Sequence, residues 1–278
     1  MRIGVTVFLT DQTMGIADLA RALEERGFQS YYIPEHTHIP VSRATPAPLG
    51  EPLPDYYART LDPFVALATA AAVAPSLRIG TGICLVAQRD PLLLAKECAT
   101  LDLVSGGRFD LGIGFGWNKE ELADHGVAFG DRRERVRESV LAMRELWAKD
   151  VAAYDGEHVR FEPSWSWPKP AGGTIPVLIG GAAGPKMFRA VLDYADGWMP
   201  IGGRGLTQNL PVLRAAAEEM GRDPDSIRVV PFGTEPNPGK MEHYRNLGIE
   251  EVVFNVPSGT ADEILPVLDD YARYVTAE

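Results

Sequence analysis

The sequence predicts an α/β protein, a (β/α)8 TIM barrel with insertions after strand 2 and before strand 5. Strand and helix signals alternate along the whole chain, and eight strand–helix units follow one another within about 250 residues, the usual size of such a barrel. No change in composition marks a second domain, so residues 1–278 are expected to form a single domain. A doubly wound open sheet is the alternative architecture.

Short apolar runs bounded by turn residues predict the strands, and apolar residues at helical spacing predict the helices. The expected strands are Ile3–Leu9, Tyr31–Pro34, Leu77–Val86, Phe109–Ile113, Pro176–Ile179, Gly197–Pro200, Arg228–Pro231 and Glu251–Val256. The expected helices are Ile16–Arg26, Asp62–Ala74, Pro91–Ser105, Asp131–Lys149, Lys186–Tyr194, Leu206–Met220, Pro238–Leu247 and Ala261–Val275.

The segment from Asp90 to Asn118 shows these signals most clearly. Pro91 suits a first helical turn with Asp90 as its cap, and the glycines after Ser105 stop the helix. The strand that follows opens into Gly114–Asn118. In a barrel this strand end lies at the C-terminal edge, where catalytic groups gather.

Two segments interrupt the repeat, Thr37–Leu61, rich in Pro and Tyr, and Tyr154–Thr174, which contains Trp165 and Trp167. Connections of this length in a compact domain are usually lids or binding loops. Both are expected at the C-terminal face of the barrel, where they either border the ligand site or are surface decoration.

The net charge of -11 and the pI near 5.0 argue against a nucleic-acid or anionic-membrane partner and leave small molecules as the expected ligands. The two cysteines, Cys84 and Cys98, are too few for a disulfide framework and lack metal-type spacing. The sequence shows neither a secretory leader nor an apolar run long enough to span a membrane. We therefore expect a cytoplasmic protein.

The second strand ends in Pro34-Glu35-His36-Thr37-His38. A histidine at such an edge can donate a hydrogen bond or move a proton, so His36 is the first candidate catalytic residue, with Glu35 beside it. Alternatively His36 and His38 ligate zinc, which would require further ligands from other strand ends, or His36 only forms a structural hydrogen bond.

Glycines mark two further positions. Gly80 and Gly82 in the third strand predict either a close approach of the backbone to a ligand or relief of crowding inside the barrel. The fifth strand ends in Gly180-Gly181-Ala182-Ala183-Gly184 just before a helix. Backbone N–H groups there suit a phosphate, although a plain helix-entry turn explains the same residues.

Taken together, these segments resemble the bacterial luciferase-like monooxygenase superfamily, especially its deazaflavin (coenzyme F420)-dependent oxidoreductase branch. The resemblance follows the same order over most of the chain. Its motifs are IPEH (33–36), IGTGI (79–83), AKECATLDLVSGGR (95–108), LGIGFGWNKEE (111–121), IPVLIGG (175–181) and ADGWMP (195–200).

The resemblance implies an enzyme that holds F420, or alternatively FMN, in the barrel mouth, and homodimers built through the helices around the early strands. It implies a cis peptide at Gly82-Ile83 against the cofactor ring, with Glu35 and His36 flanking the reactive face. It further implies that Gly180, Gly181 and Ala182 approach the phosphate and that Gly116, Trp117 and Asn118 wall the substrate side. Trp198 either packs beneath the phosphate loop or has a simple core role.

The sequence departs from the family at one position. In members that oxidise sugar phosphates, a glutamate acting as general acid occupies the place of Trp117, so that chemistry is not expected here. Glu120 and Glu121 lie nearby, but at the start of a helix their charge is also explained by the N-terminal helix dipole. The hypothesis is hydride transfer between C5 of the reduced deazaflavin and a small organic substrate. The alternatives are a monooxygenase using reduced FMN and oxygen, a non-catalytic flavin-binding barrel and a metal-dependent hydrolase.

Overall fold

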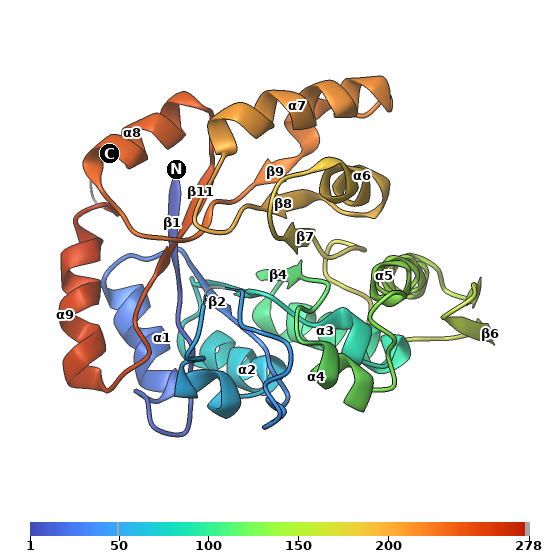
Figure 1. Ribbon diagram of the computed structural model, residues 1–278, viewed down its shortest axis with the longest axis horizontal. Coiled ribbons are helices and arrows are strands. Elements are labelled where there is room, and N and C mark those ends of the chain that lie inside the picture. The colour runs from blue at the N-terminus through green and yellow to red at the C-terminus, as the bar shows by residue number, and fades with distance from the viewer. Residues whose placement is uncertain (49, 276–278) are drawn as a thin grey trace.

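The computed structural model describes residues 1–48 and 50–275. Position 49, within the expected first insertion, and residues 276–278, at the end of the expected domain, lie outside the described residues. A parallel sheet in the order β10-β11-β1-β2-β3-β4-β7-β8-β9 forms the centre of the molecule, and helices surround it (Figure 1). The predicted TIM-barrel class is confirmed.

The strands of this sheet are β1 (Arg2–Thr6), β2 (Ser30–Ile33), β3 (Arg78–Thr81), β4 (Phe109–Ile113), β7 (Val177–Gly180), β8 (Gly197–Met199), β9 (Arg228–Val229), β10 (Phe232–Thr234) and β11 (Glu251–Asn255). The predicted seventh strand, Arg228–Pro231, is regular only over β9; Pro231, which has no N–H to donate to a ladder, interrupts the sheet, and β10 follows outside the predicted range. The N–H of Phe232 donates to the carbonyl of Pro200 at 3.0 Å, and β10 pairs with β11 on its other side. These bonds close the barrel.

The helices are α1 (Ile16–Glu25), α2 (Pro63–Val73), α3 (Pro91–Ser105), α4 (Lys119–Asp124), α5 (Arg132–Ala148), α6 (Pro185–Tyr194), α7 (Leu206–Glu219), α8 (Pro238–Asn246) and α9 (Ala261–Ala272). Asp90 caps α3 as predicted, because its Oδ1 accepts the N–H groups of Leu92 and Leu93, both at 2.9 Å. Gly106 ends the helix at φ 70°, in the left-handed region that favours glycine.

The third strand is shorter than the predicted Leu77–Val86. Its last regular residue is Thr81, and a short 3-10 helix, η2 (Val86–Gln88), follows. The N–H of Gly82 donates to Ile33 of β2, whereas that of Cys84 donates to Gly112 of β4, both at 2.7 Å. The backbone therefore changes partner within two residues, and a regular ladder cannot continue.

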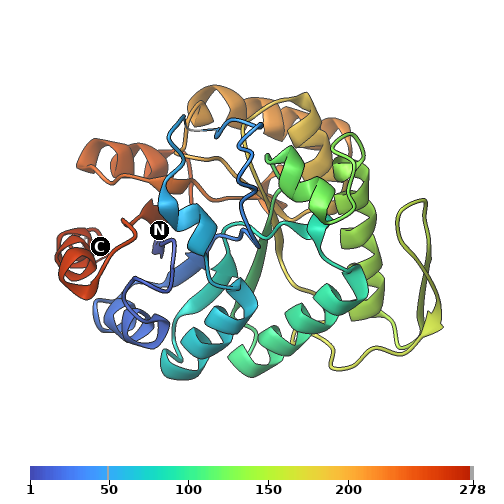
Figure 2. The same cartoon turned by 60° about the horizontal axis from the view of Figure 1, so that its bottom comes forward.

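The two insertions lie at opposite ends of the barrel. The first contains a 3-10 helix, η1 (Asp55–Arg59), and follows β2 at the C-terminal edge. The second forms an antiparallel hairpin of β5 (Ala152–Asp155) and β6 (Arg160–Ser164), which projects beside α5 (Figure 2). The expected placement of 154–174 at the C-terminal face is wrong, because a helix-to-strand connection in a parallel barrel returns the chain to the N-terminal edge.

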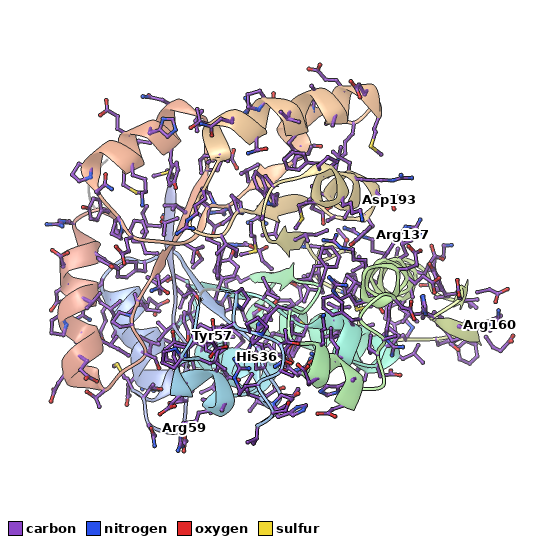
Figure 3. All side chains as sticks on the ribbon, viewed as in Figure 1. His36, Tyr57, Arg59, Arg137, Arg160 and Asp193 are labelled. Carbon is purple, nitrogen blue, oxygen red and sulfur yellow. The ribbon has the colours of Figure 1, made fainter. Side chains whose placement is uncertain are left out.

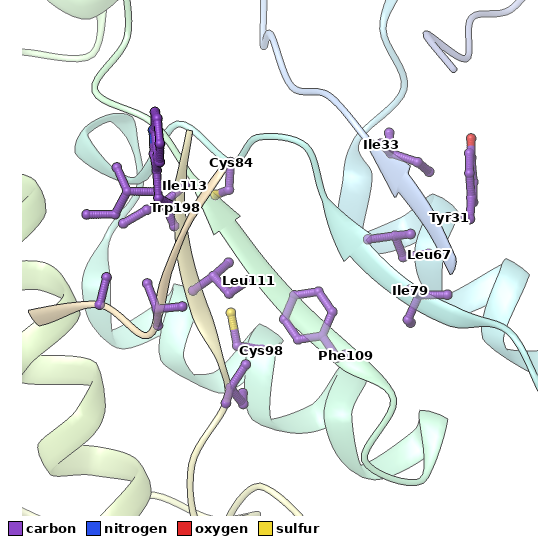
Figure 4. Packing of buried hydrophobic residues seen from close by; sticks show 14 of the residues in the cluster. Tyr31, Ile33, Leu67, Ile79, Cys84, Cys98, Phe109, Leu111, Ile113 and Trp198 are labelled. Atoms are coloured by element: carbon purple, nitrogen blue, oxygen red, sulfur yellow. The ribbon is translucent and has the colours of Figure 1, made fainter. Parts of the chain in front are cut away.

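Apolar residues fill the space between the sheet and its helices. Figure 4 shows Ile113, Trp198 and Cys84 among these packed side chains. A smaller group inside the barrel consists of Tyr32, Leu178, Met199, Val230, Phe232 and Val253. Cys84 and Cys98 are buried free thiols, and in the described ranges no helix has the length and apolar character needed to cross a membrane.

A charged cluster closes the N-terminal end of the barrel interior. Asp110 is fully buried and accepts hydrogen bonds from Arg78 at 2.7 Å and from Arg228 at 2.9 and 3.0 Å. Glu251, 1% exposed, pairs with Arg228 at 3.0 Å and accepts from the Tyr32 hydroxyl at 3.1 Å. Arg78, Arg228 and Glu251 begin their strands and Asp110 is the second residue of β4, so the cluster closes the floor of the barrel away from the mouth.

Candidate active site

His36 and Glu121 form a buried pair at the C-terminal mouth. His36 follows β2, and its Nδ1 lies 2.9 Å from Oε2 of Glu121 on α4. The two side chains are only 7% and 1% exposed. The other oxygen of Glu121, Oε1, is buried and has no partner among the described residues. A carboxylate that holds one imidazole nitrogen orients the ring and leaves the other nitrogen for a ligand.

Aromatic rings surround this pair. The rings of Tyr57 and Trp117 lie 5.3 and 5.8 Å from the His36 ring, and Tyr57 stacks on Tyr56 at 5.2 Å. Phe8, which follows β1, contacts both tyrosine rings. Figure 3 shows His36 beside Tyr57. The first insertion therefore supplies one wall of an apolar mouth, and the segment after β4 supplies another.

Glu35 is turned into a buried ion pair. Its carboxylate accepts the N–H of Leu85 and the Nε–H of Arg89, each at 2.8 Å, and its side chain is 3% exposed. Burial alone would lower the pKa of Arg89, but the charge of Glu35 raises it above the ordinary value. Arg89 also pairs with Asp62 and Glu97. These contacts tie the segment after β3 to the end of β2.

Ile83 lies between two glycines of neighbouring strands. The Gly82–Ile83 peptide bond is cis, as the resemblance implied. A Cβ added at Gly114 would lie 2.1 Å from Ile83 Cδ1, and one at Gly180 would lie 2.8 Å from its Cγ2. At Gly82 a Cβ would lie 2.3 Å from the Phe232 ring. These glycines relieve crowding inside the barrel, which was one of the two interpretations of the glycines in the third strand.

The loop after β7 has the properties of an anion site. Gly181 and Gly184 have φ of 146° and 158°, and neither Ala182 nor Ala183 forms a hydrogen bond within the described residues. Trp198 is fully buried and donates its Nε1–H to the carbonyl of Gly181 at 2.9 Å. The indole thus supports the loop from below. Unpaired N–H groups before a helix fit the phosphate of a flavin-type cofactor.

Gly116, Trp117 and Asn118 lie together between β4 and α4. Gly116 has φ 76° and packs near Leu122. Asn118 is 1% exposed, and its Oδ1 accepts the N–H groups of Glu120 and Glu121 as the cap of α4, whereas its buried Nδ2 has no partner among the described residues. The cap explains why Glu121 faces inward, since it occupies the end of the first helical turn.

Of the two histidines of the metal alternative, His36 pairs with Glu121 and His38 belongs to a surface network that also includes His125. His38 Nε2 lies 3.0 Å from Asp124, and His125 Nε2 lies 2.7 Å from the Thr37 hydroxyl. Within the described ranges there is no group of three or more His, Cys, Asp or Glu side chains arranged to hold a metal ion.

Sequence reasoning missed Glu121, Arg89 and Tyr57 as site residues. Glu121 had a usable signal, because it lies one helical turn after Asn118, and residues three apart at a helix start share a face. Tyr57 lies in an irregular insertion whose path no periodicity predicts. Arg89 had no signal of its own, since its partner Glu35 is 54 residues away in the chain.

Comparison of the sequence with known proteins identifies its family. The model of the luciferase-like monooxygenase family matches residues 7–234. An uncharacterized protein of Mycobacterium tuberculosis is 44% identical over 268 residues, which cover 95% of this chain and 94% of the relative. An F420-dependent glucose-6-phosphate dehydrogenase of Nakamurella multipartita is 32% identical over 76% of this chain. The match covers 60% of that dehydrogenase.

Solved structures share the fold. An F420-dependent secondary alcohol dehydrogenase in complex with an F420–acetone adduct superposes with a TM-score of 0.77, at 16% identity and over 100% and 99% of the two chains. An FMN complex of a type II Baeyer–Villiger monooxygenase component from Pseudomonas putida has a TM-score of 0.64, at 19% identity and over 88% and 70%. From the sequence match, the chain belongs to the luciferase-like monooxygenase family.

Proposed function

We propose that the protein is an F420-dependent oxidoreductase that exchanges a hydride with a small organic substrate beside His36. The observation that carries this proposal is the buried His36–Glu121 pair within an aromatic mouth. The family match and the F420-dependent relatives support the cofactor.

The described residues fit the cofactor at two places. The unpaired N–H groups of Ala182 and Ala183 would hold its phosphate, and the segment at Gly82–Ile83 would support its ring. When bound, the deazaflavin supplies C5 as hydride donor or acceptor. The protein contributes alignment and exclusion of water, for which the rings of Tyr57 and Trp117 are suited.

His36 accepts or donates the proton that accompanies the hydride. Glu121 occupies Nδ1, and Nε2 has no partner within the described residues. With the Nδ1 proton on the Glu121 side, Nε2 accepts a proton from a substrate that is being oxidised. In the reverse direction the imidazolium donates it. Glu35 is proposed as a positioning residue in this chemistry, because both its oxygens are engaged by Leu85 and Arg89.

Titration of the purified protein with F420 and with FMN, followed by fluorescence, tests the cofactor. We expect tighter binding of F420. Tighter binding of reduced FMN with oxygen uptake would instead support the monooxygenase alternative, for which the FMN-bound structural neighbour is the precedent.

His36→Ala should bind F420 normally and lower turnover by about 100-fold or more. Unchanged turnover would contradict the role of His36, and a protein that binds cofactor without turning over any substrate would be the non-catalytic alternative.

We also propose a homodimer formed through the early helices. α2 and α3 expose large apolar side chains, namely Val65, Leu92, Leu93, Leu103 and Val104. Covering this surface would remove apolar area from water.

The free thiols Cys84 and Cys98 support a reducing, cytoplasmic location.

A further inference from the structure

A cavity between α5 and α6 carries three cations without acidic partners. Arg133 of α5 and Lys186 and Arg189 of α6 line it together with Phe115, which follows β4, and with two acidic residues, Glu134 and Asp193, which pair with Arg137. Within the described ranges none of the three side chains forms an ion pair or a hydrogen bond. In a chain with a net charge of -11, three unpaired cations along one wall are not explained by overall charge balance.

The same cavity has a buried polar group that lacks a partner. Tyr194 is 6% exposed, lines the cavity, and its hydroxyl forms no hydrogen bond within the described residues. Burial raises the pKa of Tyr194, so the hydroxyl remains a donor at neutral pH. A buried donor without an acceptor carries a desolvation cost that an anionic ligand would remove.

The charge is uneven along the cavity. Arg137 lies one helical turn from Arg133 and is neutralised by Asp193 at 2.6 Å and Glu134 at 3.1 Å (Figure 3). Arg133 instead lies 4.0 Å from the Phe115 ring, at the end of β4. The free positive charge therefore lies toward the C-terminal edge of the barrel, where the mouth is.

This positive end adjoins the proposed phosphate loop. Lys186 is the second residue of α6, directly after the Gly180–Gly184 segment, and Arg189 follows one turn later. A ligand whose phosphate lies on the loop and whose chain continues outward with carboxylates would enter the cavity. FMN ends at its phosphate, whereas F420 continues through a lactyl group into a chain of glutamates.

We propose that Arg133, Lys186 and Arg189, with the Tyr194 hydroxyl, form a binding site for the carboxylate-bearing tail of F420. This inference rests on the proposed function and adds a specificity element to it. The cations pair with the tail carboxylates, so the site binds a cofactor that carries negative charge beyond its phosphate more tightly than one that does not.

The test compares dissociation constants of F420 carrying several glutamates and of the glutamate-free F420 that keeps the phosphate and lactyl group. Wild-type protein should bind the tailed form about tenfold tighter or more. Arg133→Gln/Arg189→Gln should lose this advantage and leave the affinity for the glutamate-free form unchanged. The single variant Arg189→Gln, at an exposed position, should keep the fold and lose part of this advantage.

Arg160→Gln is the matched control, because it removes one positive charge on the remote hairpin (Figure 3) and should leave both constants unchanged. The advantage of the tailed form should also shrink as salt rises. Equal binding of both forms by wild type, or equal weakening of both by the double variant, would overturn the site while leaving F420 as the cofactor. Binding of FMN and of neither F420 form would overturn both the site and the proposed function.

Discussion

Nδ1 of His36 lies 2.9 Å from Oε2 of Glu121, although the two residues are 85 positions apart in the chain. The contact joins the end of β2 to the first turn of α4, and both side chains are nearly inaccessible to solvent. The pair gives the candidate site a group that can hold a proton and a second group that fixes its orientation.

Glu121→Ala should lower turnover by about 10- to 100-fold, because His36 loses the carboxylate that orients it. Glu121→Gln keeps an oxygen acceptor and should retain more activity. The double variant His36→Ala/Glu121→Ala should be no slower than His36→Ala alone, since the two residues act as one unit. Steady-state rates and F420 dissociation constants measure this, and independent, multiplicative effects would contradict it.

Gly112→Ala and Gly114→Ala should differ in their effect on stability. A Cβ at Gly112 would lie 2.1 Å from the Thr81 carbonyl oxygen, which belongs to the backbone. At Gly114 the obstacle is the Cδ1 of Ile83. We expect Gly114→Ala to cost about 1–3 kcal/mol of unfolding free energy and Gly112→Ala more.

Ile83→Val removes the obstructing Cδ1 and should recover stability in the Gly114→Ala background. It should not do so in the Gly112→Ala background, because Thr81 is unaffected. Urea denaturation of the three single variants and the two double variants checks this. A rescue of Gly112→Ala by Ile83→Val would show that the packing around Ile83 is not as described.

Asp110→Asn should destabilise the protein by about 3–5 kcal/mol at neutral pH, since it removes the buried anionic partner of Arg78 and one of the two that Arg228 has, the other being Glu251. Asp269→Asn is the control, because the pair of Asp269 with Arg26 is exposed and should contribute about 0–1 kcal/mol. Equal effects of the two substitutions on the unfolding free energy would contradict the structural role of Asp110.

The contribution of Asp110 should also depend on pH. Burial raises the pKa of Asp110, but the hydrogen bonds and charges of Arg228 and Arg78 lower it by more than burial raises it. The pKa therefore lies below its ordinary value of 3.8. A depressed carboxyl pKa contributes stability above the unfolded-state pKa, and this stability is lost as the pH falls through the folded-state pKa. The gap between wild type and Asp110→Asn should therefore narrow below about pH 4 in denaturation series.

Arg89→Ala and Glu35→Ala should have similar effects. Each breaks the buried pair that ties the segment after β3 to β2, and each should cost about 3–5 kcal/mol. The double variant should cost less than the sum. A direct catalytic role of Glu35 would appear instead as a loss of turnover in Glu35→Ala that Arg89→Ala, at equal stability, does not share.

Leu93→Glu or Val104→Glu should convert the proposed dimer to a monomer. Both side chains lie on α3 and are 57% and 60% exposed. Val212→Glu on α7, where the side chain is 54% exposed, is the control and should leave the assembly unchanged. Light scattering coupled to size-exclusion chromatography measures the mass. A wild-type monomer at micromolar concentration would contradict the proposal.

The order of the strands, the helix starts at Asp62 and Asp90 and the turn at Gly106 could be predicted from the sequence, because caps, glycine turns and apolar periodicity act over a few neighbouring residues. The end of β3 and the location of the hairpin at residues 152–164 could not. Both depend on which strands and helices lie beside these segments.

The sequence by itself determined the family, the barrel and the candidate residue His36. Only the tertiary structure decided that Glu121 holds His36, that Glu35 pairs with Arg89, and that Ile83 fills the space left by Gly114 and Gly180. Each of these contacts joins segments brought together by closure of the barrel. The pattern along the chain specifies which face a side chain takes, whereas its partner depends on the position of every other strand.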